Sequence, residues 1–459
     1  MPFTVNGCGT HYYGRRNESK FAGTCASCGR HAWLSSYDTR ECICLIYIPV
    51  VPLRRYRISN QCSLCTRHAR PCLPRGRRNL ISLLKIENRP DEAIQVATEW
   101  MTSCQSSGAL EAHRAYQDLI LDAGGKEKLI SDYRARLAEH PEVGANHYLY
   151  GRLLSEPELS MSEHRESLRL DPKLAWARVA LAYDLLALEQ RPEAFHELSL
   201  AMSSPEHAPE AAYPYALAAV GAGTLREAQA LLARLVKQHS EDGNVWESLW
   251  LVELASERWS VAERMVRERA SLERPVDAWQ HRSKLLRLRG LTDQVTQALA
   301  TAEGQAELAE AAAAARFERL IEEGRYTEAA ARLEQDFPKG PPPLYRLYAA
   351  AGLMMAGDPL AAKGQLAQLA GNHGSDALEA LARRLRGEIS AEQAIRQARA
   401  DHFLTLTHAY FMLGARATYE KNRTLAAQFF AQSRASALDL GFPFEAARRL
   451  AGDSPRVKR

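Results

Sequence analysis

From about residue 80 to the C-terminus, apolar residues recur at helical spacing in short segments that turn residues separate. The clearest segment has apolar or small residues at relative positions 0, 3, 4 and 7, which are Trp176, Val179, Ala180 and Tyr183. A second segment has them at 0, 4 and 7, which are Ala194, Leu198 and Ala201. Both spacings place the residues on one face of a helix. Asp171-Pro172 interrupts the helical pattern just before the first helix. The pattern therefore predicts two amphipathic helices joined by a turn.

The small residue of the second helix returns at a nearly constant interval. Steps of 32 to 34 residues connect Ser160, Ala194, Ala228, Ala262, Val295, Ala329, Ala362, Ala394 and Ala426. Glycines stand five residues before several of them, at Gly223, Gly290, Gly324 and Gly357. A glycine ends a helix at low cost, so these residues are expected in the turn within each helix pair. Ala93 fits a first unit, and the repeat is weakest between residues 100 and 160. The interval predicts about eleven helix pairs over residues 75–454.

The order of residue types in each unit resembles the pattern of the tetratricopeptide (TPR) family. In that pattern a large residue, a small residue and an aromatic residue follow one another on the first helix, and a small residue opens the second helix. The spacing between first and second helices is two residues longer here. A heptad coiled coil or an unrelated α bundle would not place Gly and Ala in phase at this interval. The resemblance implies a mainly α, TPR-like solenoid in which each unit contacts its neighbours and the first helices line an extended concave groove.

Such grooves bind peptides or partner domains, so the resemblance implies a protein or peptide partner. By analogy with the family, the groove positions of the clearest units are Asn244, Glu247, Asp277, Gln280, Lys284 and Arg287. These residues are mixed in sign, and they could equally be a solvated helix face. Their mixed charges indicate no single class of ligand.

Eight of the nine cysteines lie within the first 72 residues. Four of them form two C-x-x-C pairs: Cys25, Cys28, Cys62 and Cys65. Each pair presents two sulfurs from one tight turn, and two such turns complete a tetrahedron around Zn²⁺. Four thiolates close the coordination shell, so the expected zinc is structural. The same four sulfurs also suit iron, as in rubredoxin-like electron carriers.

Between the two pairs, Leu45–Ile48 has the composition of a β-strand ending at Pro49, and residues 54–58 have that of a second strand. The segment before the second cysteine pair resembles that of small zinc ribbons that carry an FFIPxxP segment. It begins with Arg40-Glu41, continues with an apolar run that contains Tyr47-Ile48-Pro49 and Pro52, and ends in a C-x-x-C. Cys42 and Thr66 depart from that family's pattern, but neither is a predicted ligand. The resemblance implies a β zinc ribbon, placed at residues 1–74. The roles of Cys8, Cys42, Cys44 and Cys72 are left open, although Cys42 and Cys44 fit small core positions.

Charged residues are distributed unevenly along the chain. Residues 1–80 hold thirteen Lys/Arg and three Asp/Glu, a balance of +10, whereas the remainder has −6. Basic and aromatic residues on a ribbon can bind nucleic acid, which makes that partner an alternative. The same charges would also be explained by a solvated linker. Docking of the basic N-terminal segment on the acidic repeats is a further explanation.

The N-terminal residues lack the basic and apolar regions of a signal peptide. The longest apolar run, residues 42–53, is about half a membrane span. These features predict a cytoplasmic chain without a membrane partner. Phosphate-binding, hydrolase and metalloprotease motifs are missing from the sequence, and residues 455–459 read as a disordered tail. The sequence thus predicts a non-enzymatic, zinc-containing scaffold.

Overall fold

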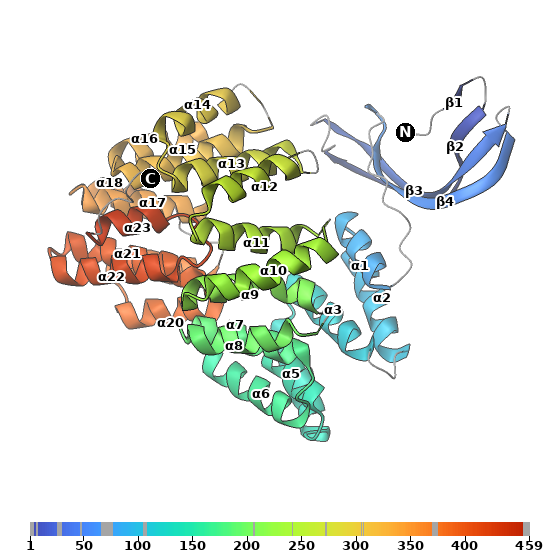
Figure 1. Ribbon diagram of the computed structural model, residues 1–459, viewed down its shortest axis with the longest axis horizontal. Coiled ribbons are helices and arrows are strands. Elements are labelled where there is room, and N and C mark those ends of the chain that lie inside the picture. The colour runs from blue at the N-terminus through green and yellow to red at the C-terminus, as the bar shows by residue number, and fades with distance from the viewer. Residues whose placement is uncertain are drawn as a thin grey trace. The chain divides into compact units, whose positions relative to one another are not determined.

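The computed structural model describes residues 4–5, 8–24, 30–45, 48–65, 77–103, 108–204, 207–240, 242–270, 273–303, 305, 307–369 and 375–452. Two compact units divide the chain, Met1–Asp132 and Tyr133–Arg459. The predicted boundary between residues 74 and 75 and the predicted tail both lie outside the described residues. The chain is mainly α, and its described residues form 23 helices after the N-terminal strands (Figure 1).

The first unit begins with an antiparallel sheet in the order β1-β2-β3-β4. Its strands are β1 (Thr4–Val5), β2 (Cys8–Thr24), β3 (His31–Leu45) and β4 (Ile48–Cys62). Successive strands are joined as hairpins, so each strand pairs with the one before it in sequence.

One predicted strand is wrong and one is confirmed. Leu45 ends β3 and Ile48 begins β4, and the two residues pair across the hairpin, so residues 45–48 do not form one strand. An apolar run indicates β propensity, but it does not show where the chain reverses. The predicted strand at residues 54–58 lies within β4.

Helices follow the sheet. The first unit contains α1 (Arg77–Ile86), α2 (Pro90–Ser103) and α3 (Gly108–Asp122), and α4 (Lys126–Glu139) spans the division between the units. Ala93, predicted as the small residue of a first repeat, is fully buried between α1 and α2. A methyl group at this position lets the two helices approach closely.

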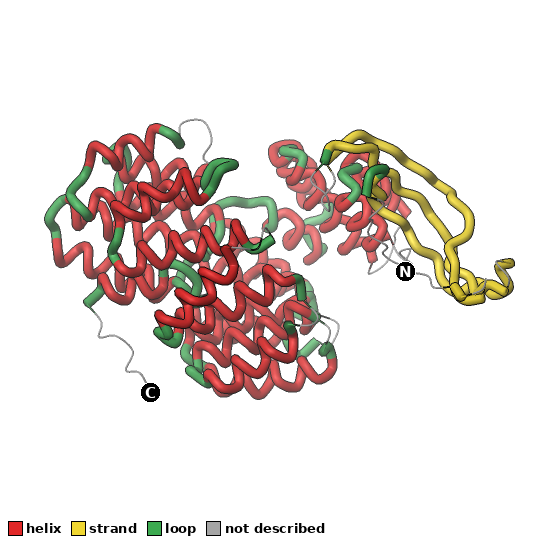
Figure 2. The backbone as a smooth tube through the Cα atoms, turned by 90° about the horizontal axis from the view of Figure 1, so that it is seen from above, coloured by secondary structure: helices red, strands yellow, loops and turns green. Residues whose placement is uncertain are grey.

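The second unit is built from consecutive helix pairs (Figures 1 and 2). The first helices of these pairs are α5 (Gly144–Gly151), α7 (Ala175–Ala187), α9 (Ala208–Ala222), α11 (Gly243–Ala255), α13 (Pro275–Leu288), α15 (Ala309–Glu323), α17 (Pro343–Met355), α19 (Asp376–Arg386) and α21 (Thr405–Tyr419). The second helices are α6 (Pro157–Leu170), α8 (Arg191–Ala201), α10 (Leu225–Gln238), α12 (Trp259–Arg269), α14 (Thr292–Glu303), α16 (Tyr326–Asp336), α18 (Pro359–Ala367), α20 (Ala391–Asp401) and α22 (Arg423–Ser436). A last helix, α23 (Phe444–Leu450), follows them. Each first helix packs on its own second helix and on the first helix of a neighbouring pair, which gives two layers.

The predicted repeat register is confirmed. The small residues of the second helices are all buried, with exposed fractions from 0% at Ala194 to 5% at Ala426. The turn glycines all have positive φ, from 69° at Gly290 to 84° at Gly357. A residue without Cβ adopts this left-handed conformation without strain, which is why glycine recurs at this point of the repeat.

The second unit also closes on itself, which the sequence does not predict. Phe403, Leu438 and Leu440 belong to the same apolar core as residues of α7, α8, α9 and α11. The Phe403 ring lies 5.5 Å from that of Tyr183 on α7. Contacts therefore reach well beyond neighbouring repeats, and the expectation that each unit touches only its neighbours is wrong here. In Figure 1, α20 lies beside α7 and α8.

Candidate functional site

A pocket of about 460 Å³ opens on α11 and α13. It contains three of the predicted groove residues, Glu247, Asp277 and Gln280. Further lining comes from Gly243, Trp246, Arg269, Glu273, Arg274 and His281. Glu247 follows Trp246 on α11, and Gln280 and His281 are adjacent on α13. The helical repeat therefore brings together side chains that are more than 30 residues apart in sequence.

Aromatic rings form the base of this pocket. Trp246 is 7% exposed, and its ring lies 5.1 Å from that of His281 in an edge-on arrangement. The Arg269 guanidinium lies 5.4 Å from the Trp246 ring centroid. Cationic and edge-on contacts suit the negative face of an indole. The base is thus fixed by packing before anything binds.

Most charges on the rim are already paired. Glu273 accepts from Arg269 at 3.1 Å and contacts His281 Nδ1 at 3.0 Å. Arg274 donates twice to Asp277, at 2.6 and 2.7 Å. This hydrogen bonding lowers the pKa of Asp277, which keeps its carboxylate ionised.

Glu247 and Gln280 differ from their neighbours. Within the part of the chain that the structure describes, neither side chain has a hydrogen bond or an ion pair. Glu247 is half-buried and Gln280 is exposed. A carboxylate offers only acceptors, and an amide offers both donors and acceptors. This pair can therefore bind an incoming ammonium or guanidinium group together with backbone groups of an extended segment.

The other three predicted groove residues are bound by the chain itself. Asn244 donates to the carbonyl oxygen of Pro209 at 2.6 Å. Lys284 donates to the carbonyl oxygen of Asp439 at 2.7 Å, and burial lowers its pKa. Arg287 pairs with Glu318 through Nη1, and its Nε lies 3.6 Å from Glu322. These three side chains are engaged inside the second unit, whereas Glu247, Asp277 and Gln280 lie together at the pocket.

Sequence reasoning missed the segment that meets Lys284. Leu438, Asp439 and Leu440 pass along the first helices, and both leucines are buried. Phe442 packs 4.5 Å from the ring of Tyr348, whose hydroxyl lies 2.7 Å from Nδ1 of His408. Residues 437–442 have no repeat periodicity, so no pattern in the sequence indicates that they pack against the first helices.

The sheet holds the second candidate site. Thr24 and His31, which flank the first cysteine pair, pair with each other at one end of β2 and β3. At the same end, Leu34 of β3 pairs with Cys62 of β4. Cys25 and Cys28 lie outside the described residues. The strand register therefore places Cys62 at the same end of the sheet as Thr24 and His31.

Cys62 ends β4, and Cys65 lies in the turn that follows it. The Leu64 N–H donates to Cys62 Sγ at 3.4 Å, and Ser63 N–H donates to the Trp33 carbonyl oxygen at 2.9 Å. N–H groups directed at sulfur favour the thiolate, which is the form that binds a metal. Among the described residues no three potential metal ligands come together, and half of the predicted set lies outside that range.

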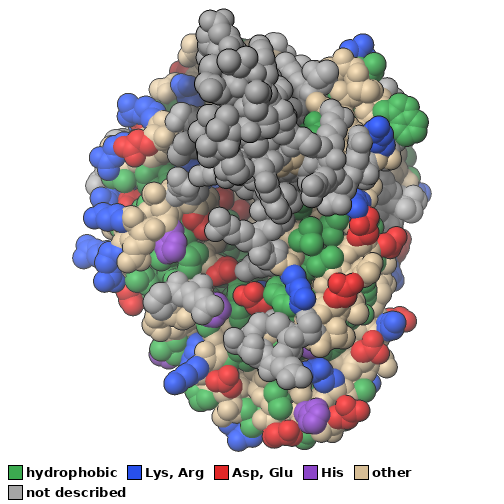
Figure 3. Space-filling model, turned by 90° about the vertical axis from the view of Figure 1, so that its right-hand side faces the viewer, with side chains coloured by type: hydrophobic (Ala, Val, Ile, Leu, Met, Phe, Trp, Pro, Cys, Tyr) green, Lys and Arg blue, Asp and Glu red, His purple; other side chains and the backbone are tan. Residues whose placement is uncertain are grey.

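The visible charges of the helical repeats are interspersed. Figure 3 shows Asp/Glu and Lys/Arg side chains next to one another over the lower part of the face in view.

Among the described residues, none of the helices is both long enough and apolar enough to cross a bilayer.

Comparison with known proteins gives only a likeness of fold. No family model and no curated protein matches the chain. Among solved structures, a TPR protein from Parabacteroides merdae is 12% identical, with a TM-score of 0.35 over 50% of this chain and 92% of its own. PilF of Pseudomonas aeruginosa is 14% identical, with a TM-score of 0.34 over 48% and 94%. The human IFIT1 dimer with PPP-AAAA is 15% identical, with a TM-score of 0.35 over 78% and 81%. Such loose overlays transfer no function to this chain.

Proposed function

We propose that this chain is a non-catalytic adaptor whose helical repeats bind an extended segment of a partner protein at the α11–α13 pocket. The supporting observation is that Glu247 and Gln280, beside the buried Trp246, make no hydrogen bond or ion pair within the described chain. Paired helices offer recognition surfaces, and polar groups without partners in a pocket supply specificity.

The charge at the pocket favours a basic segment. Three carboxylates, on Glu247, Glu273 and Asp277, face two guanidiniums, on Arg269 and Arg274, which leaves a balance of −1 with His281 neutral. Glu247 would accept from a lysine or arginine of the partner, and Gln280 would bond its backbone. Charged hydrogen bonds of this kind contribute about 1.5–3 kcal/mol each.

We further propose that the N-terminal sheet holds one structural zinc through Cys25, Cys28, Cys62 and Cys65. The strand register and the N–H bond to Cys62 Sγ support this proposal. Bound zinc would join the end of the β2–β3 hairpin to the end of β4, and four thiolates would leave no open position for catalysis. Iron in the same site is the alternative that metal analysis distinguishes.

A displayed library of random peptides, panned on the whole chain, tests the adaptor function. Enriched peptides should carry Lys or Arg, and their affinity should fall about tenfold or more in Glu247→Gln. The matched control is Glu268→Gln on α12, where the side chain is 70% exposed. Enriched peptides that bind the wild type and Glu247→Gln equally would show that this pocket is not the site.

A further inference from the structure

A pocket of about 260 Å³ lies between the two helices of one repeat, α13 and α14. Trp279 and Arg282 line it from α13, and Gln294 and Gln297 line it from α14. Among the described residues that line this pocket, Arg282 carries the one formal charge, and no carboxylate opposes it. The pocket shares no lining residue with the α11–α13 pocket, so the two sites are separate.

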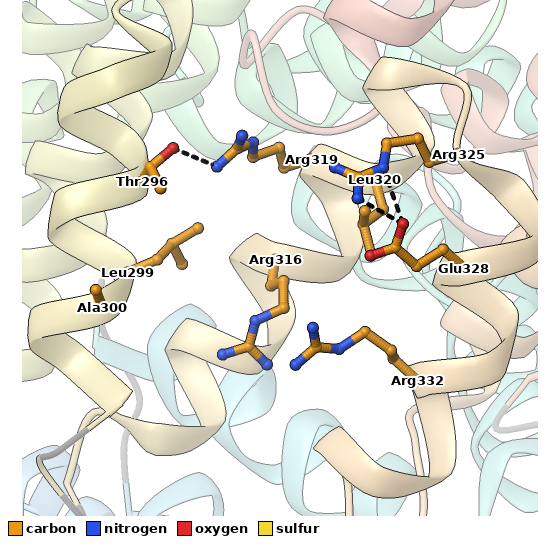
Figure 4. A pocket seen from close by; sticks show the side chains of 9 residues that line it. All are labelled: Thr296, Leu299, Ala300, Arg316, Arg319, Leu320, Arg325, Glu328 and Arg332. Atoms are coloured by element: carbon orange, nitrogen blue, oxygen red, sulfur yellow. Dashed lines mark hydrogen bonds and ion pairs between the residues drawn. The ribbon is translucent and has the colours of Figure 1, made fainter.

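A pocket on α14, α15 and α16 shows the opposite situation, because the chain itself pairs the arginines there (Figure 4). Arg325 donates to Glu328 at 2.5 Å. Arg316 and Arg332 both approach Asp336, at 2.7 and 3.6 Å. Each of the four guanidiniums in that pocket lies beside a carboxylate of this chain. Their charges are compensated without a ligand.

Arg282 has no such compensation. Within the part of the chain that the structure describes, its guanidinium makes no hydrogen bond and no ion pair. The side chains of Gln294 and Gln297 make none either, and these two residues are neighbours on one face of α14. A guanidinium offers only donors, whereas each amide offers donors and an acceptor. Three polar side chains at the pocket are therefore available to a ligand.

The apolar side of the pocket is held in place by packing. Trp279 is half-buried, and its Nε1 donates to the carbonyl oxygen of Ala298 at 3.4 Å. Leu308, which also lines the pocket, is 5% exposed and belongs to the same apolar cluster as Trp279. A ligand with a polar head and an apolar stem can therefore contact both kinds of surface at once.

Charge and size together select the ligand. A carboxylate carries one negative charge, which matches the single guanidinium, and its two oxygens fit the guanidinium fork. A phosphate monoester carries about −1.5 to −2 at neutral pH, which one arginine with neutral amides would not balance. The volume is below the roughly 300–1,000 Å³ typical of sites for larger ligands, so the pocket suits a group the size of one side chain.

We propose that this pocket binds a carboxylate on a short apolar stem, with Arg282 on its two oxygens and the stem against Trp279 and Leu308. The group could be a glutamate side chain of a partner protein or a free small carboxylic acid. Both sources present the same chemistry to Arg282. The amides of Gln294 and Gln297 donate to the lone pairs that the guanidinium leaves open.

Saturation-transfer NMR of the full chain tests this assignment with acetyl-Ala-Glu-Ala-amide, its glutamine counterpart and butyrate. The glutamate peptide and butyrate should bind, and the glutamine peptide should bind about tenfold more weakly. Tighter binding of the glutamate peptide than of butyrate indicates a partner protein, whereas equal or tighter binding of butyrate indicates a free acid. Arg282→Gln should weaken both acids about tenfold. The control is Arg264→Gln on α12, where the side chain is 64% exposed and affinity should not change.

A second variant separates binding from folding. Gln297 is exposed on α14, so Gln297→Glu should leave the helical circular dichroism intact while its new carboxylate pairs with Arg282 and repels the ligand. Binding that is equal in the wild type, Arg282→Gln and Gln297→Glu would overturn the proposal. So would equal binding of the glutamate and glutamine peptides, tighter binding of a phosphoserine peptide, or no binding of either acid.

Discussion

The hydroxyl of Tyr410 on α21 donates a 2.8 Å hydrogen bond to the carboxylate of Glu189, which stands 221 residues earlier in the turn after α7. Arg399 approaches the same carboxylate to 3.6 Å. Tyr410 is 3% exposed, whereas the Glu189 side chain is 29% exposed. It joins the last helix pair of the second unit to one of the first.

Removal of this bond should weaken the closed arrangement. Tyr410→Phe deletes the donor and leaves a half-buried carboxylate without it, at a cost of about 1–3 kcal/mol. The loss is measurable as a lower urea midpoint of unfolding followed by circular dichroism. Tyr419→Phe is the matched control, because that side chain is 39% exposed. Equal midpoints for Tyr410→Phe and wild type would show that the long-range bond contributes nothing.

His408 should make the second unit sensitive to acid. Burial lowers the pKa of His408 to about 4, whereas an unfolded histidine titrates near pH 6.5. Between these values the unfolded state binds more protons, so stability is complete above pH 6.5 and falls as the pH drops toward 4. The loss attributable to this one side chain is on the order of 3 kcal/mol.

Unfolding free energies measured from pH 7 to pH 4.5 test that slope. His408→Gln keeps a group that can accept from Tyr348, and it should flatten the slope over this range. His140→Gln changes a histidine whose side chain is 62% exposed, so the wild-type slope should remain. A slope unchanged in His408→Gln would assign the acid sensitivity to other groups.

Two glycines within helices should respond oppositely to alanine. A Cβ at Gly414 would lie 2.7 Å from Cε1 of Phe430, which is 2% exposed and has little room to move. Gly414→Ala should therefore destabilise by about 1–3 kcal/mol. A Cβ at Gly364 would meet no heavy atom within 4 Å, so Gly364→Ala should stabilise by about 0.5–1 kcal/mol. Thermal unfolding of the two variants measures both changes in stability. A change of the same sign in both variants would contradict the packing described here.

Metal analysis tests the proposed ribbon. Purified protein should contain one zinc per chain, and Cys62→Ser should lose it and unfold the sheet while the helical signal stays nearly constant. Cys104→Ser, which alters a cysteine outside both C-x-x-C pairs, should keep the zinc. A visible thiolate-to-iron absorption in place of stoichiometric zinc would identify the metal as iron.

The sequence predicts the repeats well because their causes are local. A small residue such as Ala228 is needed wherever two helices cross closely, and Gly223 wherever the chain turns through positive φ. These requirements recur with every unit, so they appear as a period. The four-cysteine zinc site stays a prediction, because Cys25 and Cys28 lie outside the described residues.

The closure could not be predicted in this way. Lys284 and Asp439 come together because the stacked repeats curve, and curvature is the sum of small rotations that no single repeat encodes. Family analogy placed Lys284 and Arg287 at an open groove, although Asp439 binds Lys284 and Glu318 of the neighbouring helix α15 binds Arg287. Glu247 and Gln280, in contrast, lie at the pocket that the analogy indicated.

The adaptor proposal depends most directly on contact between a partner and Gln280. A photo-crosslinking amino acid placed at position 280 should capture a partner segment containing lysine or arginine in extracts of the native host. The same group at position 428, an exposed glutamine on the second helix α22, should not capture it. Loss of the product in Glu247→Gln would support the pocket as the binding site. Equal capture from positions 280 and 428, or capture that survives Glu247→Gln unchanged, would contradict it.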